Sequence, residues 1–204
     1  LCTFLLTSLF VVKDSYDQYR INAAKSFYGD YDVKYTTFAY TQNKEYTDTY
    51  LDSLSYETPL PYMYKGTFDS LVSTTNFSVY PIRLIEGKYP KSNEVLIHKK
   101  YQNKYKVGDT IKLYADQDSK EYKISGIYEN LNNQLINYSF YTSTHSKKDA
   151  MYVYANLKDK SAIATLPVQD YELNSDMVVA KYHLNVEYEN IFKFLILFMS
   201  VCCF

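Results

Sequence analysis

Residues 83–128, which read RLIEGKYPKSNEVLIHKKYQNKYKVGDTIKLYADQDSKEYKISGIY, decide the fold of this chain. Short apolar runs bounded by turn residues predict strands over 94–98, 110–114 and 121–128. Two tyrosines four residues apart in 99–105 predict one helix of about two turns. Because helical and strand patterns are mixed without regular alternation, the stretch favours an α+β fold, a mixed sheet domain with a few short helices.

The turn at 86–90 combines two residues with restricted or special backbone angles. Gly87 supplies a positive φ angle and Pro90 a fixed one. Asn93 and Glu94 follow, and their side chains are suited to hydrogen-bond loose backbone amides before the next strand enters the sheet.

A second turn and an irregular strand complete the segment. Gly108 is predicted to take the left-handed conformation while the carboxylate of Asp109 accepts a neighbouring N–H. In 121–128 the apolar residues stand at even positions up to Ile124, but the next one is Ile127. This change of phase predicts a β-bulge at Gly126.

The segment resembles the core of the extracytoplasmic domain of ABC-transporter permeases of the FtsX/MacB type. That family shows an apolar-x-G-x-x-P turn, an N-E-apolar-apolar strand, a small helix, a V-G-D-T-I turn and a strand ending in apolar-x-G-I. The matching residues are Gly87, Pro90, Asn93, Glu94, Val107, Gly108, Asp109, Ile111, Gly126 and Ile127. Residues 28–31 and the pair Leu173-Asn174 resemble the Gram-positive members more loosely. All of these are scaffold positions, so they indicate a fold and no ligand site.

The resemblance implies a permease subunit of the cell membrane whose soluble part lies outside the cytoplasm. It would pair with a cytoplasmic ABC ATPase, form a permease dimer and engage a peptide, a lipid-linked substrate or an accessory protein. Two alternatives remain: an extracytoplasmic sensor domain of a membrane receptor, which also lies between two membrane helices, and a secreted binding or structural domain.

The two ends of the chain are apolar. Residues 1–12 carry no charge, and 191–204 carry only Lys193. Each run is shorter than the roughly 20 residues that span a bilayer, and we expect two truncated transmembrane helices. A signal peptide or two buried helices are the alternatives. The expected organisation is the end of a first transmembrane helix (1–12), a helical stem (13–28), the α+β domain (29–186), and a stem with the start of a second transmembrane helix (187–204).

Further patterns outline the rest of the domain. Apolar residues at helical spacing predict a helix over 13–27 that ends at Gly29. Residues 30–39 alternate as a half-buried strand, with Asp32 and Lys34 on the polar face. Helical spacing returns at 46–54, the prolines at 59–61 are expected to break the chain, and 77–85 and 151–155 are predicted strands.

The polar stretch 129–149 is predicted to be a long loop or hairpin, and 131–148 is the candidate interaction loop. Connections of more than about 12–15 residues without structure are usually functional or disordered, and both alternatives stand here. The residues that would carry recognition are Asn137, Tyr138, Tyr141 and His145.

Composition argues against several classes of function. The net charge of −1 leaves no basic surface for nucleic acid. Cys2, Cys202 and Cys203 lie only in the apolar ends, the histidines are isolated, and no catalytic motif occurs. We therefore expect no enzyme activity, catalytic residue, metal or cofactor. The 25 tyrosines, with no tryptophan, have two interpretations: drift in an AT-rich gene, or a tyrosine-lined surface for peptides or sugars.

Overall fold

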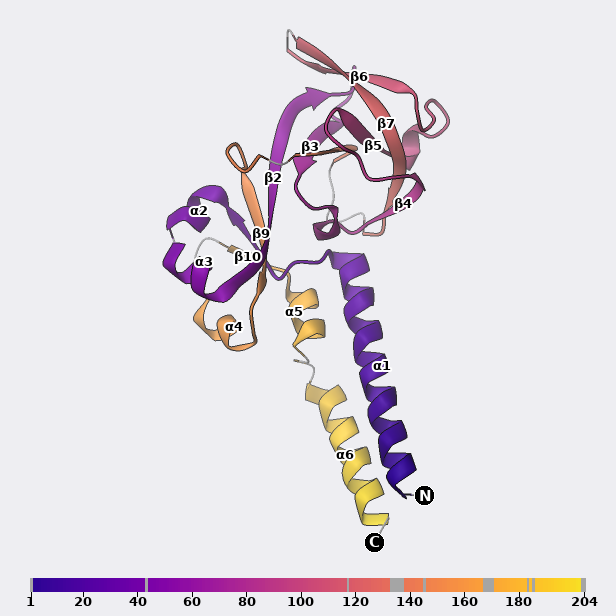
Figure 1. The fold of residues 1–204 in the computed structure, drawn as a ribbon, viewed down its shortest axis with the longest axis vertical. Helices are drawn as coiled ribbons and strands as arrows, with labels where there is room; N and C mark the ends of the chain where they lie inside the picture. The colour runs from indigo at the N-terminus through magenta and orange to yellow at the C-terminus, as the bar shows by residue number, and fades with distance from the viewer. Residues whose placement is uncertain are drawn as a thin grey trace.

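The computed structural model describes residues 2–42, 44–116, 118–132, 138–144, 146–166, 171–182, 184 and 186–202. It shows a mixed α+β domain from one end of which two helices, α1 (Cys2–Tyr28) and α6 (Val186–Cys202), extend side by side (Figure 1). Both chain termini lie at the far ends of these helices (Figure 1).

The described strands form one ten-stranded mixed sheet in the order β10-β1-β9-β2-β3-β8-β5-β7-β4, and β6 pairs with β2 and β7. The pairs β3–β8 and β5–β7 are parallel and the other pairs are antiparallel. The strand bounds are β1 Val33–Thr36, β2 Leu51–Met63, β3 Ser70–Thr74, β4 Ile82–Gly87, β5 Glu94–His98, β6 Thr110–Ala115, β7 Asp118–Asn130, β8 Phe140–Ser143, β9 Tyr152–Leu157 and β10 Tyr171–Leu173.

The long strand β2 connects two lobes (Figure 1). One lobe holds β1, β9 and β10 with the short helices α2 (Thr37–Gln42), α3 (Lys44–Tyr50) and α4 (Ser161–Thr165). The other holds β3 to β8 with the 3-10 turns η1 (Phe77–Val79) and η2 (Lys99–Tyr101). A buried cluster rich in tyrosine includes residues of both lobes, Tyr154 of β9 and Tyr141 of β8 among them. Helix α5 (Ser175–Lys181) packs against α1.

Four of the predicted strands and the predicted helix over 13–27 are confirmed. Strands β5, β6, β7 and β9 occupy the predicted positions within a few residues. The predicted helix over 13–27 is part of α1, and Gly29 ends it with φ +88° while its N–H donates to the Lys25 carbonyl at 3.0 Å. Helical spacing and a terminal glycine were sufficient for this prediction because both act within one element.

Four local predictions were wrong. The strand expected over 30–39 is only β1, because α2 begins at Thr37, and Asp32, assigned to a polar face, is fully buried. The prolines at 59–61 lie inside β2, since the pairing of β2 with β9 ends at Glu57 and a missing N–H is tolerated there. The helix expected over 99–105 is only η2, and η1 replaces the first part of the strand expected over 77–85.

The long loop expected over 129–149 contains a central strand. β8 lies between β3 and β5, and the Tyr141 side chain is fully buried. The residues on either side of β8 are polar. Within the strand, the polar Thr142 is also part of the sheet, because its hydroxyl donates to the Glu94 carbonyl at 2.7 Å. Four residues with polar neighbours give too short a pattern to identify a strand that is covered on both faces.

The turn geometry predicted for Gly87 and Gly108 and the side-chain hydrogen bonds predicted for Glu94 and Asp109 are confirmed. Gly87 has φ +81° and Gly108 has φ +99°. Glu94 Oε2 accepts from the Lys91 N–H at 2.9 Å, and Asp109 Oδ2 accepts from the Lys106 N–H at 2.8 Å. Asn93 itself adopts φ +66°, a left-handed conformation that asparagine tolerates better than most residues.

The bulge predicted in β7 is also present. Val95 of β5 pairs with Ile124 and Leu96 pairs with Gly126, so Ser125 is the extra residue. A Cβ atom on Gly126 would lie 2.7 Å from the Glu86 carbonyl oxygen. The change of phase in the sequence therefore reflects a real irregularity where β4 crosses close to β7.

None of the helices within the described residues is both long enough and apolar enough to cross a bilayer.

Two of the left-handed glycines, Gly87 and Gly108, provide a matched test of this fold. Gly108→Val should lower the free energy of unfolding by about 1–3 kcal/mol, because a β-branched residue fits a positive φ poorly although space is available. Gly87→Val should cost more, because its Cβ would lie 2.2 Å from the Ser125 carbonyl oxygen. Urea unfolding of the whole chain in a non-ionic detergent measures both. Equal stability of Gly108→Val and wild type would contradict the left-handed turn.

Candidate functional site

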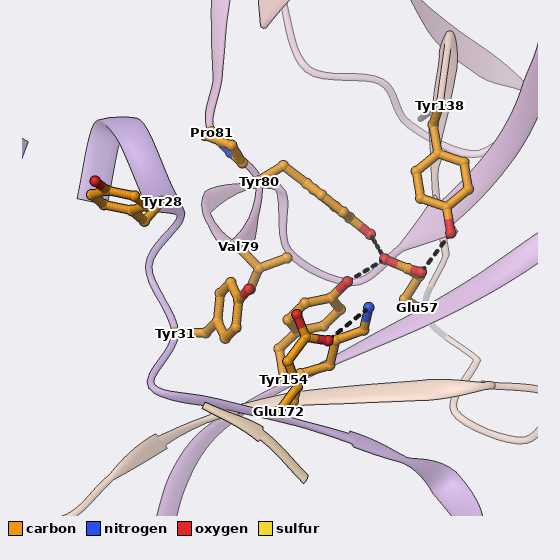
Figure 2. Close-up of a pocket in the computed structure, with 10 residues that line it drawn as sticks. Tyr28, Tyr31, Glu57, Val79, Tyr80, Pro81, Tyr138, Tyr154 and Glu172 are labelled. Carbon is orange, nitrogen blue, oxygen red and sulfur yellow. Dashed lines mark hydrogen bonds and ion pairs between the residues drawn. The ribbon is translucent and has the colours of Figure 1, made fainter. Parts of the chain in front are cut away.

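The most unusual group in the sheet is the carboxylate of Glu57 in β2, which is fully buried. Its Oε2 accepts hydrogen bonds from the hydroxyls of Tyr80 at 2.5 Å and Tyr154 at 2.7 Å, and its Oε1 accepts from Tyr138 at 2.9 Å (Figure 2). These donors come from the turn after η1, from β9 and from the segment before β8. No lysine or arginine among the described residues forms an ion pair with Glu57.

The tyrosines around Glu57 act as permanent hydrogen-bond donors. Burial raises the pKa of the Tyr80 hydroxyl well above its usual range, and the nearby charge of Glu57 raises it further. Burial and then Glu57 raise the pKa of Tyr154 and of Tyr138 in the same way. The hydroxyls therefore keep their protons at neutral pH, which lets them solvate a carboxylate that has no cationic partner in the described residues.

A cavity of about 320 Å³ lies against this tyrosine–carboxylate group (Figure 2). The cavity lies where the helical stem meets the sheet. Its wall is contributed by the end of α1, by β1 and the chain before it, by β2, by η1 and the turn after it, by the segment before β8, and by β9 and β10. The lining residues are Tyr28, Tyr31, Lys34, Glu57, Val79, Tyr80, Pro81, Tyr138, Tyr154 and Glu172.

Lys34 places an ammonium group at this wall. Its Nζ lies 4.4 Å from the ring centroid of Tyr152 and 5.5 Å from that of Tyr154. The same Nζ is 3.8 Å from a carboxylate oxygen of Glu172, which is largely exposed. A cation on the face of two aromatic rings is attracted by their negative faces.

A second buried carboxylate lies beside the cavity, at the base of the stem. Asp32 Oδ2 accepts from the Leu157 N–H at 2.8 Å, from Lys181 Nζ at 2.6 Å and from the Tyr182 hydroxyl at 3.2 Å. These contacts join the chain before β1 to β9 and to the end of α5. Asp32 is therefore a structural cross-link, and no cavity residue depends on it for a hydrogen bond that the structure describes.

Asn174 completes this junction between stem and sheet. Its Nδ2 donates to the carbonyls of Tyr28 at 3.1 Å and Tyr31 at 3.0 Å, and its Oδ1 accepts from the Met177 N–H at 3.4 Å. One side chain thus satisfies the end of α1 and the start of α5 together. The pair Leu173-Asn174 therefore has a structural role in the fold.

The predicted scaffold residues lie away from the cavity. The residues that shape the turns and the bulge of β4 to β7, none of them in the cavity wall, are Gly87, Pro90, Asn93, Glu94, Gly108, Asp109 and Gly126.

The candidate interaction loop is corrected by the structure. Tyr141 is a core residue of β8 whose ring packs 4.8 Å from that of Tyr80, so it is not exposed for recognition. Tyr138 lines the cavity and donates to Glu57, so it contributes to a site, although not as part of a free loop. Asn137 and His145 lie outside the described residues.

The sequence did not identify Glu57, Tyr80 or Tyr154. Each lies in a different element, and no local spacing relates them. The abundance of tyrosine was the one available signal, and it suggested a tyrosine-lined surface without locating it. No group of three histidine, cysteine, aspartate or glutamate residues in the described part of the chain is arranged to hold a metal ion.

Comparison with known proteins provides no family for the chain: no protein-family profile matches it, and no curated protein matches it.

Replacing Glu57 tests the tyrosine–carboxylate group. Glu57→Ala should destabilise the protein by about 3 kcal/mol or more, because three tyrosine hydroxyls, two of them on buried residues, lose their acceptor. Glu57→Gln keeps an acceptor and a similar volume, and it should cost less than about 1.5 kcal/mol. Urea unfolding monitored by circular dichroism distinguishes them. Equal losses in the two variants would show that the hydroxyls do not need this acceptor.

The tyrosine cluster also predicts loss of stability at alkaline pH. Burial, with smaller contributions from Glu172 and Glu57, raises the pKa of Tyr31 from 10.0 to about 12. Because the folded pKa is higher, the stabilisation is complete below pH 10 and is lost as the pH rises through 12, by about 2–3 kcal/mol for one such tyrosine. Unfolding curves between pH 9 and 12 should show this decline, and Tyr31→Phe should make it shallower. An unchanged slope in Tyr31→Phe would refute the assignment.

Proposed function

We propose that the chain is the extracytoplasmic domain of an ABC-transporter permease of the FtsX/MacB type, with parts of two transmembrane helices at its ends. The permease is a dimer in the cell membrane and is driven by a cytoplasmic ATPase. The observation that carries this proposal is that α1 and α6 extend side by side, in opposite chain directions, from the same end of the sheet domain (Figure 1).

The surface of the two helices supports a lipid environment. Soluble proteins rarely expose large contiguous apolar patches, whereas a bilayer would cover these side chains. The large apolar residues exposed on α1 and α6 include Phe4, Phe10, Val11, Val12, Ile191, Phe194, Leu197, Phe198 and Val201. Those on α1 belong to the half of the helix that is far from the sheet (Figure 1).

The junction between stem and sheet supports transmission of motion. Small residues allow α1 and α5 to pack closely, with Ala24 of α1 against Met177 and Ala180 of α5. Asn174 and Asp32 then connect this pair to the chain around β1 and to β9 through side-chain hydrogen bonds. A displacement of the stem would therefore be passed to the sheet through packed and hydrogen-bonded groups.

The turn geometry agrees with the resemblance. Gly87 and Gly108 have the positive φ angles expected for the two glycine turns of the FtsX/MacB pattern. The carboxylate of Asp109 accepts a hydrogen bond from the Lys106 N–H in the second turn. These features support the family assignment at the level of the fold.

The sensor domain of a membrane receptor is the second candidate function. It is favoured by the cavity at the base of α1, because a ligand there would contact Tyr28, the last residue of the stem helix. The two candidates differ in what lies on the cytoplasmic side of the membrane.

Purification of the full-length protein from its native membranes distinguishes the two functions. We expect a separate subunit to co-purify that is labelled by a photoreactive ATP analogue, and excess ATP should suppress the labelling. The control is the same purification from cells that lack the tagged protein. Absence of an ATP-binding subunit, together with a signalling module on the same polypeptide, would replace the transporter proposal by the sensor.

A further inference from the structure

We propose that the cavity at the junction of α1 and the sheet is a binding site for a small organic cation with a primary ammonium group, such as an amine or the amino group of a peptide. The proposal does not depend on the transporter function, because it rests on the chemistry of the cavity wall alone. It applies equally if the domain is a sensor.

The aromatic lining and the volume of the cavity suit an ammonium group. Aromatic ring faces attract cations, and more strongly where water is excluded. Five tyrosines contribute to the wall: Tyr28, Tyr31, Tyr80, Tyr138 and Tyr154. The volume of about 320 Å³ is at the lower end for ligand cavities, so it suits a small ligand or a single side chain.

The direction of the tyrosine hydroxyls selects the charge of the ligand. Tyr80, Tyr138 and Tyr154 each direct their single proton to Glu57, as Figure 2 shows. Their oxygens can then only accept a hydrogen bond from a group in the cavity. A primary ammonium group has three donors and no acceptor, so it matches this wall.

The fixed charges also favour a cation. Glu57 is a fully buried residue of the cavity wall, and Glu172 is a largely exposed one. Lys34 is the one cationic lining residue, so two carboxylates face one ammonium group. Because Glu57 has no cationic partner in the described residues, its charge is available to attract a bound cation through the wall.

Lys34 shows that an ammonium group fits the outer part of this surface. Its Nζ lies over the rings of Tyr152 and Tyr154 and near Glu172 at 3.8 Å. A bound ligand ammonium would share Tyr154 and Glu172 with it and would be repelled by it. Lys34 is therefore expected to weaken binding, and its removal to strengthen it.

The position of the cavity gives binding a structural consequence. Tyr28 and Tyr31 flank Gly29, the left-handed residue at which α1 ends. A Cβ atom on Gly29 would lie 2.2 Å from the Val79 carbonyl oxygen, so the turn is closely packed against the cavity wall. A ligand that contacts both tyrosines would therefore change or hold the angle between the stem helix α1 and the sheet.

Isothermal titration of the whole chain in dodecyl maltoside, with n-butylammonium chloride as the probe, tests the site. We expect saturable binding with Kd of about 1 mM, whereas n-butanol and sodium butyrate, of matched size, should not bind measurably. Butanol binding as tightly as butylammonium would overturn the proposal, because the cavity would then be only an apolar pocket. Displacement of butylammonium by an equal concentration of K⁺ would overturn it in favour of a metal-cation site.

Variants separate a binding site from a structural cluster. Glu57→Gln should weaken butylammonium binding about tenfold, and Lys34→Met should strengthen it. The control Glu86→Gln makes the same change in net charge on the exposed face of β4 and should bind as wild type. Tyr138→Phe, at a half-buried position, removes one acceptor oxygen and should also weaken binding, which keeps the test valid if Glu57→Gln does not fold. Equal affinity of wild type, Tyr138→Phe and Lys34→Met would refute the site.

Discussion

The middle of this structure depends on the burial of one carboxylate. Glu57 is in β2, the strand that joins the two lobes, and its hydrogen bonds reach residues 80, 138 and 154. A buried carboxylate without its donors would be strongly destabilising, so the three segments must come together for β2 to occupy the centre of the sheet. All three donor residues also line the cavity beside β2.

Tyrosine suits such a core because it combines a large apolar ring with a hydroxyl at its edge. The ring of Tyr80 packs against those of Tyr141 and Tyr154 at centroid distances of 4.8 and 6.0 Å. A hydroxyl that donates to an acceptor also fixes the orientation of its ring, as those of Tyr80 and Tyr154 do by donating to Glu57. A core of phenylalanine in these positions would pack as well, but it could not hold a carboxylate.

A second buried carboxylate, that of Asp32, lies at the base of the stem, but its hydrogen-bond partners differ from those of Glu57. Asp32 is also fully buried, but its partners include the ammonium group of Lys181, so its charge is neutralised inside the protein. Glu57 has only neutral donors among the described residues. This difference explains why we assign a structural role to Asp32 and an electrostatic role in binding to Glu57, although both carboxylates are fully buried.

The sequence by itself determined those features that depend on neighbours along the chain: α1 and its end at Gly29, the strands β5, β6, β7 and β9, the glycine turns at 87 and 108, and the bulge beside Gly126. In each, hydrophobic spacing or a positive φ angle acts within a few residues. It did not determine β8, the course of β2 through its prolines or the burial of Asp32, because these depend on which strand lies alongside. The group formed by Glu57, Tyr80, Tyr138 and Tyr154 was decided only by the tertiary structure. A glutamate in a polar stretch resembles a surface residue until the sheet brings three distant hydroxyls within hydrogen-bonding distance of its carboxylate.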